Sequence, residues 1–109
     1  MRLVNLTPHV VTIFDAAGAV MHTHAAAEAP ARVMVTRSDD GTIEGVPIVT
    51  EHYGRAELPE PVGDVRYIVS VAVALAHPER ADLLVPTDLV RTEEGTVVGC
   101  RALSRRVAG

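Results

Sequence analysis

Short apolar runs with the character of β-strands, separated by turn residues, occupy most of the 109-residue chain. Val10–Phe14 is the clearest of them, because β-branched and aromatic residues favour extended backbone. Other runs alternate between apolar and polar residues, which is typical of a strand with one buried face. The predicted strands are Arg2–Leu6, Val10–Phe14, Ala19–His24, Arg32–Arg37, Ile43–Thr50, Val65–Val69, Leu83–Val85, Leu89–Thr92 and Thr96–Leu103.

Glycine, proline and acidic residues mark the places where these strands should end. Three segments have the composition of hairpin turns, namely Asp15–Gly18, Asp39–Gly41 and Glu93–Gly95. Proline has no backbone donor, so we expect Pro86 to end the strand before it. For the same reason Pro47 predicts that its strand is an edge strand or contains a bulge.

One segment, Ser70–His77, predicts a helix. Ser70 can cap its start, and Pro78 would stop it. The segment is apolar around most of its circumference, so we expect other elements to cover it on more than one side. Together the elements predict a single α+β domain over residues 1–109. Its sheet is expected to be mostly antiparallel, a small sandwich or barrel-like, with one short helix packed on it.

Composition narrows the classes of function. The net charge is −4 and only 3% of the residues are aromatic, which argues against a nucleic-acid partner, because such proteins present basic faces and stacking aromatics. A lone cysteine, Cys100, excludes an intramolecular disulfide framework and a cysteine-rich zinc site. The N-terminus lacks the apolar stretch of a signal peptide, and no run reaches the about 18–20 apolar residues of a membrane span. We therefore expect a cytoplasmic protein without a membrane partner.

Two histidines form the most obvious metal-like pair. His22 and His24 are two residues apart on a predicted strand, so both imidazoles would point to the same face. Zinc would need further ligands, for which His9, His52 or a carboxylate are candidates. The H-E-x-x-H spacing is absent, and an exposed strand face that carries two histidines is the favoured interpretation of the pair. We therefore assign no metal ligand.

Two polar segments are candidate binding sites. Asn5, Thr7 and His9 lie in a loop between strands, where His9 could donate to a ligand, while Asn5 and Thr7 could instead satisfy turn backbone groups. In the second segment Tyr53 offers a platform on which a ring could stack, and Arg55 could hold a phosphate or carboxylate. The alternative reading of this segment is a polar strand end that leads into a loop.

A third candidate lies near the C-terminus. Arg101 and Arg105 share one face in either a helix or a strand, so their guanidinium groups could converge on a diphosphate. A solvated tail is the alternative reading. Cys100 follows a glycine in an apolar strand and is expected to be a small core residue. The P-loop, G-x-G-x-x-G and G-x-S-x-G motifs are all absent, so we expect no cofactor and lean against an enzyme.

Six motifs follow one another along the chain, namely N-L-T-P-H (Asn5–His9), G-V-P-I-V-T-E-H-Y-G (Gly45–Gly54), L-P-E-P (Leu58–Pro61), Y-I-V-S (Tyr67–Ser70), L-L-V-P (Leu83–Pro86) and E-G-T-V-V-G-C-R (Glu94–Arg101). With these motifs in this order, nearly the whole chain resembles a family of small proteins of actinobacteria and their phages, to which no activity is attached. A second resemblance, based on size, the α+β outline and the late pair Arg101 and Arg105, is to phage proteins that sequester nucleotide immune signals.

The resulting hypothesis is a non-enzymatic protein that binds and sequesters a small nucleotide-derived anion of the ADP-ribose type, as a phage counter-defence. A pocket at the interface of a homo-oligomer is easier to build than one inside so small a protomer. The predicted ligand-binding residues are Asn5, Thr7, His9, Tyr53, Arg55, Arg101 and Arg105. The alternatives are a metal-dependent hydrolase or lyase that uses His22, His24 and His9, and an adaptor that binds another protein.

Overall fold

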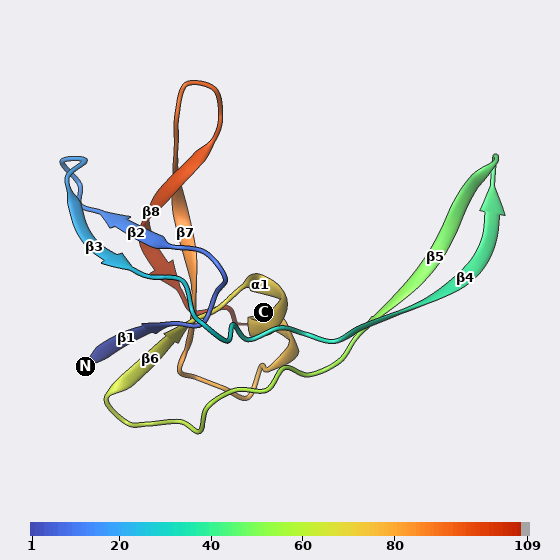
Figure 1. The fold of residues 1–109 in the computed structure, drawn as a ribbon, viewed down its shortest axis with the longest axis horizontal. Coiled ribbons are helices and arrows are strands. Elements are labelled where there is room, and N and C mark those ends of the chain that lie inside the picture. The colour runs from blue at the N-terminus through green and yellow to red at the C-terminus, as the bar shows by residue number, and fades with distance from the viewer. Residues whose placement is uncertain (108–109) are drawn as a thin grey trace.

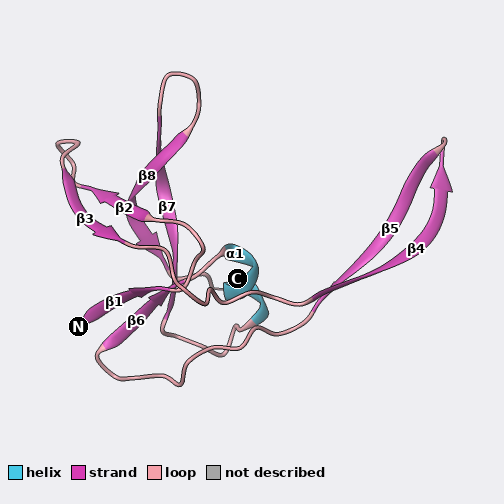
Figure 2. Cartoon of the chain, viewed as in Figure 1, coloured by secondary structure: helices cyan, strands magenta, loops and turns pink. Residues whose placement is uncertain are grey.

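The computed structural model describes residues 1–107, which form a six-stranded sheet with one helix and a hairpin that projects far from both (Figures 1 and 2). We call the sheet and helix the body, and the hairpin, made of β4 and β5, the arm. The strand order in the sheet is β1-β6-β7-β8-β2-β3. The elements are β1 (Arg2–Asn5), β2 (Val11–Phe14), β3 (Val20–His24), β4 (Val35–Ile43), β5 (Val46–Tyr53), β6 (Val65–Ile68), α1 (Val71–Ala76), β7 (Leu83–Arg91) and β8 (Val97–Ser104).

The predicted composition, mostly strands with one short helix, is confirmed. The pairing in the sheet is more mixed than the sequence predicted. β7 with β8 and β2 with β3 are antiparallel, as their turn residues indicated. β1 with β6, β6 with β7 and β2 with β8 are parallel. Turn residues identify only strands that follow one another closely, whereas parallel strands need long crossovers that leave no local signal.

The predicted end of a strand at Pro86 is wrong, because β7 runs without interruption from Leu83 to Arg91. β7 pairs with β6 only at Leu83 and Leu84, and from there onward it pairs with β8 alone. Pro86 therefore lies where one side of the strand has no neighbouring strand in the sheet. Proline is tolerated at such an edge position because its missing N–H faces away from a partner.

The turn predicted at residues 39–41 is also wrong, since these residues lie inside β4 at an irregularity in its pairing with β5. The side chain of Asp39 accepts a hydrogen bond from the Gly41 N–H at 2.9 Å, so the turn-like residues form a local bend within the strand. The chain reverses later, at Glu44 and Gly45, whose φ values are 52° and 80°. Positive φ at both central residues is the requirement of the tight turn that suits a twisted hairpin.

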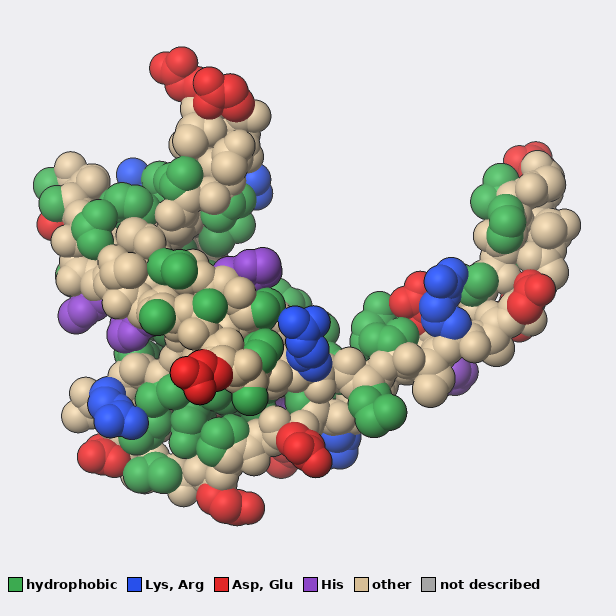
Figure 3. Space-filling view, viewed as in Figure 1, with side chains coloured by type: hydrophobic (Ala, Val, Ile, Leu, Met, Phe, Trp, Pro, Cys, Tyr) green, Lys and Arg blue, Asp and Glu red, His purple; other side chains and the backbone are tan. Residues whose placement is uncertain are grey.

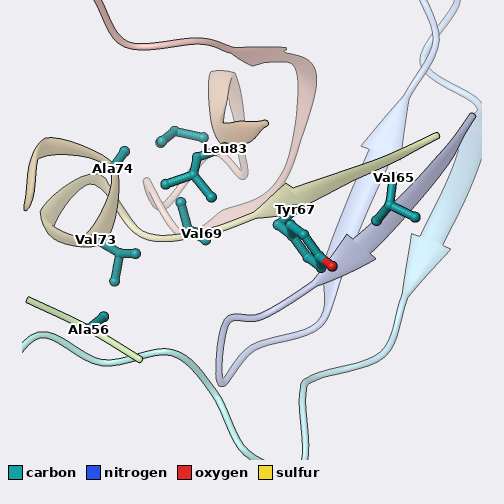
Figure 4. Close-up of a cluster of buried hydrophobic side chains, with 8 residues drawn as sticks. Ala56, Val65, Tyr67, Val69, Val73, Ala74 and Leu83 are labelled. Atoms are coloured by element: carbon teal, nitrogen blue, oxygen red, sulfur yellow. The ribbon is translucent and has the colours of Figure 1, made fainter. Parts of the chain in front are cut away.

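The core lies between α1 and the sheet (Figure 4). Val73 of α1 is completely buried against a cluster that includes Val69 and Leu83. Ser70 caps the helix as predicted, because its side chain accepts a hydrogen bond from the Val73 N–H. A second cluster, around Ile68 and Cys100, fills the region between β6, β2 and β8.

Within residues 1–107, other elements cover only one side of the helix, although its apolar circumference predicted cover on more than one side. Val71 remains 41% exposed and Leu75 66% exposed on its outer face. The body therefore buries one side of α1 and leaves the other, which is equally apolar, open to water. Among the described residues, no helix is long and apolar enough to cross a membrane.

Candidate functional site

An apolar cleft of about 850 Å³ lies between the body and the root of the arm. The buried side chains of Val85 and Cys100 lie at its base. Val35 and Tyr53, which are paired across the two strands at the root of the arm, line it from the other side. Figure 3 shows hydrophobic side chains gathered where the arm leaves the body. The volume is within the range of small-molecule sites, which are about 300–1,000 Å³.

A few polar groups interrupt the apolar lining. His9 and Arg32 are exposed at the cleft, and Ser70 contributes the hydroxyl that caps α1. Sequence reasoning missed Arg32, because it lies in a segment without any motif and becomes significant only once the chain folds around the cleft. A cation and an imidazole beside an apolar surface can hold the anionic end of an amphipathic ligand.

Asn5 and Thr7 form a buried hydrogen-bond knot that organises the loop before β2. Asn5 Nδ2 donates to His9 O at 2.7 Å and to Ala25 O at 3.1 Å. Asn5 Oδ1 accepts from the Thr7 N–H at 2.9 Å and from the Thr7 hydroxyl at 2.8 Å. The side chains thus satisfy backbone groups of two segments about 20 residues apart. Thr7 and His9 line the cleft, whereas Asn5 does not line it and instead holds both residues in place through its hydrogen bonds.

Arg55 fastens the end of the arm to the body. Its guanidinium donates to the Glu79 carboxylate at 2.9 Å and to Ala76 O at 3.3 Å. This contact lowers the pKa of Glu79 and raises that of Arg55, because each charge stabilises the other. Next to it, the Ala56 N–H donates to Nε2 of buried His77 at 2.9 Å. The Arg55 guanidinium is therefore engaged within the protein and does not line the cleft formed by the described residues.

Arg101 and Arg105 are exposed, and neither is among the described residues that line the cleft. Successive side chains of a strand point to opposite faces, so Arg101 points away from the side to which Cys100 points. The structure therefore separates the predicted arginine pair from Tyr53. Of the seven predicted site residues, three line the cleft: Thr7, His9 and Tyr53.

His22 and His24 point to one side of β3, with ring centroids 5.9 Å apart. His24 Nε2 is buried and has no hydrogen-bond partner among residues 1–107. Within the same residues, no group of three or more His, Cys, Asp or Glu side chains is placed to hold a metal ion. The third ligand that zinc would need, for which His9 was a candidate, is therefore not brought to the pair.

Cys100 lies at the base of the cleft with 1% of its surface exposed. Burial raises the pKa of its thiol above the ordinary value, because the thiolate would be separated from water. The thiol therefore remains protonated near neutral pH and contributes apolar surface to the site. This agrees with the core role that the sequence predicted for it.

Comparisons with family models, with curated proteins and with solved structures found no match to this chain.

Proposed function

We propose that the protein is a non-enzymatic binding protein that sequesters a small nucleotide-derived anion in the cleft. The single observation that supports this most strongly is the cleft itself, with its volume of about 850 Å³ and mainly apolar lining. Such a site buries most of a small amphipathic molecule and fixes its orientation with a few polar groups. Capture of an ADP-ribose-type signal inside a phage-infected cell is the role we propose for this binding.

The cleft offers complementary places for the two ends of such a ligand. The exposed ring of Tyr53 and the valines of the cleft suit the flat face of a base. Arg32 and His9 suit the phosphates, because a guanidinium pairs with phosphate through two hydrogen bonds. In this proposal Arg32 binds the phosphates, which is the role that the sequence predicts for Arg55, Arg101 and Arg105.

Binding without catalysis is supported by the state of two groups at the cleft, the Thr7 hydroxyl and the Cys100 thiol. Thr7 Oγ1 donates within the loop knot, and the Cys100 thiol has a raised pKa. Neither group is activated by an adjacent base in the way that a nucleophile requires. We therefore propose that the bound molecule leaves the cleft chemically unchanged.

Calorimetry with ADP-ribose, its cyclic isomers and cyclic dinucleotides tests the proposal. At about 50 μM protein, we expect heat from at least one of them with a dissociation constant in the micromolar range or below. Arg32→Gln should weaken that binding about 10- to 100-fold, since a hydrogen bond to a charged group contributes about 1.5–3 kcal/mol. Heat from none of the compounds would refute the proposal.

A matched variant tests whether the ligand binds at the cleft or at the arginine pair near the C-terminus. The double variant Arg101→Gln and Arg105→Gln removes two charges outside the cleft and should leave the affinity within about twofold. A loss of affinity in this double variant, with Arg32→Gln unaffected, would place the ligand elsewhere. Mass spectrometry of the recovered ligand checks that it is unmodified.

A further inference from the structure

The arm lacks the packing that a hairpin needs in water. Within residues 1–107, β4 and β5 pair with each other and form no sheet with another element. No residue of either strand is buried. A two-stranded hairpin alone is marginally stable in water, and it normally requires a further strand or an apolar partner.

The strand register divides the arm into two different faces. Residues directly opposite each other share a face, so the pairs Val35–Tyr53, Arg37–Glu51 and Asp39–Val49 form one side, which we call the charged face. The opposite side, which we call the second face, carries one charged residue of the two strands, Asp40, which lies at the irregularity opposite Ile48. Its other residues are apolar or neutral polar, namely Thr36, Ser38, Ile43, Val46, Ile48, Thr50 and His52.

The surface that the arm leaves open is large enough for a stable interface. The radius of gyration is 16.6 Å, against about 13 Å for a compact domain of this length. The accessible surface is 7514 Å², whereas a folded monomer of this mass exposes about 5,800 Å². The excess is about 1,700 Å² per chain, and a standard interface buries about 1,600 Å² counting both partners.

The body carries an apolar surface of its own beside the cleft. The outer side of α1 presents Val71 and Leu75, and with Tyr53 these residues line a second hollow of about 430 Å³. Tyr53, Val71 and Ala72 line both this hollow and the main cleft. The two surfaces are continuous, so a partner that covers the outer side of α1 also covers one side of the cleft.

We propose that two copies of this chain exchange arms, so that the second face of each arm packs on the outer side of α1 in the other copy. Both complementary surfaces belong to the same chain, so a two-fold arrangement forms the contact twice. Two chains together offer about 3,400 Å² of excess surface, which matches the 2,000–5,000 Å² buried in permanent dimers. In this dimer the partner's arm closes one side of the cleft.

Sedimentation equilibrium of the ligand-free full chain tests the exchange. We expect twice the 11.6 kDa of the monomer at micromolar concentration. Ile48→Asp on the second face and Leu75→Asp on α1 should each raise the dimer dissociation constant at least about 100-fold, because each substitution would bury an unpaired carboxylate in the interface. The control Val49→Asp lies next to Ile48 in the same strand but on the charged face, and it should remain dimeric.

Three results would overturn the proposal. They are a monomeric wild-type chain at 100 μM, a dimer that Ile48→Asp leaves intact, and equal disruption by Val49→Asp and Ile48→Asp. Circular dichroism shows whether each variant is folded. Should Ile48→Asp unfold, Ile48→Thr keeps a β-branched side chain and is expected to weaken the dimer about tenfold. Neither Ile48 nor Leu75 lines the main cleft, and sedimentation uses the ligand-free chain, so a monomeric result would overturn the dimer without refuting ligand binding.

Discussion

The knot around Asn5 gives the sharpest test of whether the N-terminal loop is structural or binds the ligand. Asn5 is 7% exposed and makes four hydrogen bonds of 2.7–3.1 Å, to His9 O, Ala25 O and two groups of Thr7. At a net contribution of about 1 kcal/mol for each bond, Asn5→Ala should lower the free energy of unfolding by about 4 kcal/mol. This is a large part of the about 5–15 kcal/mol that stabilises a typical domain.

Asn5→Asp is the matched variant, because it preserves size and the acceptor Oδ1 while it replaces the donor Nδ2 with a second oxygen. That oxygen would face His9 O and Ala25 O at hydrogen-bond distance. We expect Asn5→Asp to destabilise the fold at least as much as Asn5→Ala, since it buries a charge against carbonyl groups. Thr7→Ser keeps the hydroxyl and should lose less than about 1 kcal/mol.

Urea titration followed by circular dichroism measures these changes. With a slope of about 1.5 kcal/mol per molar urea, 4 kcal/mol corresponds to a midpoint about 2.7 M lower. The reasoning would be refuted by an Asn5→Ala variant whose midpoint is unchanged but whose ligand affinity is lost. In that case Asn5 would contact the ligand and contribute little to the fold.

Two further predictions concern other parts of the core. Arg80 holds the pKa of the Asp82 carboxyl below its ordinary value through two hydrogen bonds of 2.8 Å. The stabilising contribution of this ion pair is therefore present above the ordinary pKa of about 4 and is lost as the pH falls further. The free energy of unfolding, measured by urea titration at each pH, should therefore fall more between pH 7 and pH 3 in the wild type than in Asp82→Asn. In Gly99→Ala the added Cβ would overlap the Phe14 ring and lie 2.5 Å from the backbone oxygen of Thr12, which should cost about 1–3 kcal/mol or more. Gly63→Ala meets no atom within 4 Å and should be close to neutral, so equal thermal midpoints for the two variants would contradict this.

The parts of the fold that depend on neighbours in sequence were predictable. Ser70 caps the helix, and the turn at Gly95 joins β7 to β8, as the local residues indicated. Pro86 was misread because its effect depends on whether a strand borders it on both sides. Residues 39–41 were misread because Asp39 can satisfy the local backbone inside a strand as well as in a turn. Parallel pairing was missed because its partners are distant in sequence.

The candidate site was less predictable than the fold, because chain segments far apart in the sequence converge to form it. Thr7, His9 and Tyr53 line the cleft, yet no local pattern indicates that Val35 and Cys100 lie there with them. Arg55 has the residue type of an anion clamp, but Glu79 occupies its guanidinium. Only the three-dimensional structure reveals which charges are already paired.

The arm also affects how the size of this molecule can be measured. The chain extends 49 Å along its longest axis and 32 Å along its shortest. Gel filtration separates by hydrodynamic radius, so a single copy with its arm extended elutes earlier than a compact protein of 11.6 kDa. A monomer can therefore imitate a dimer on such a column. Conversely, two copies with their arms folded over each other form a rounder particle, whose frictional ratio is lower than that of the free chain.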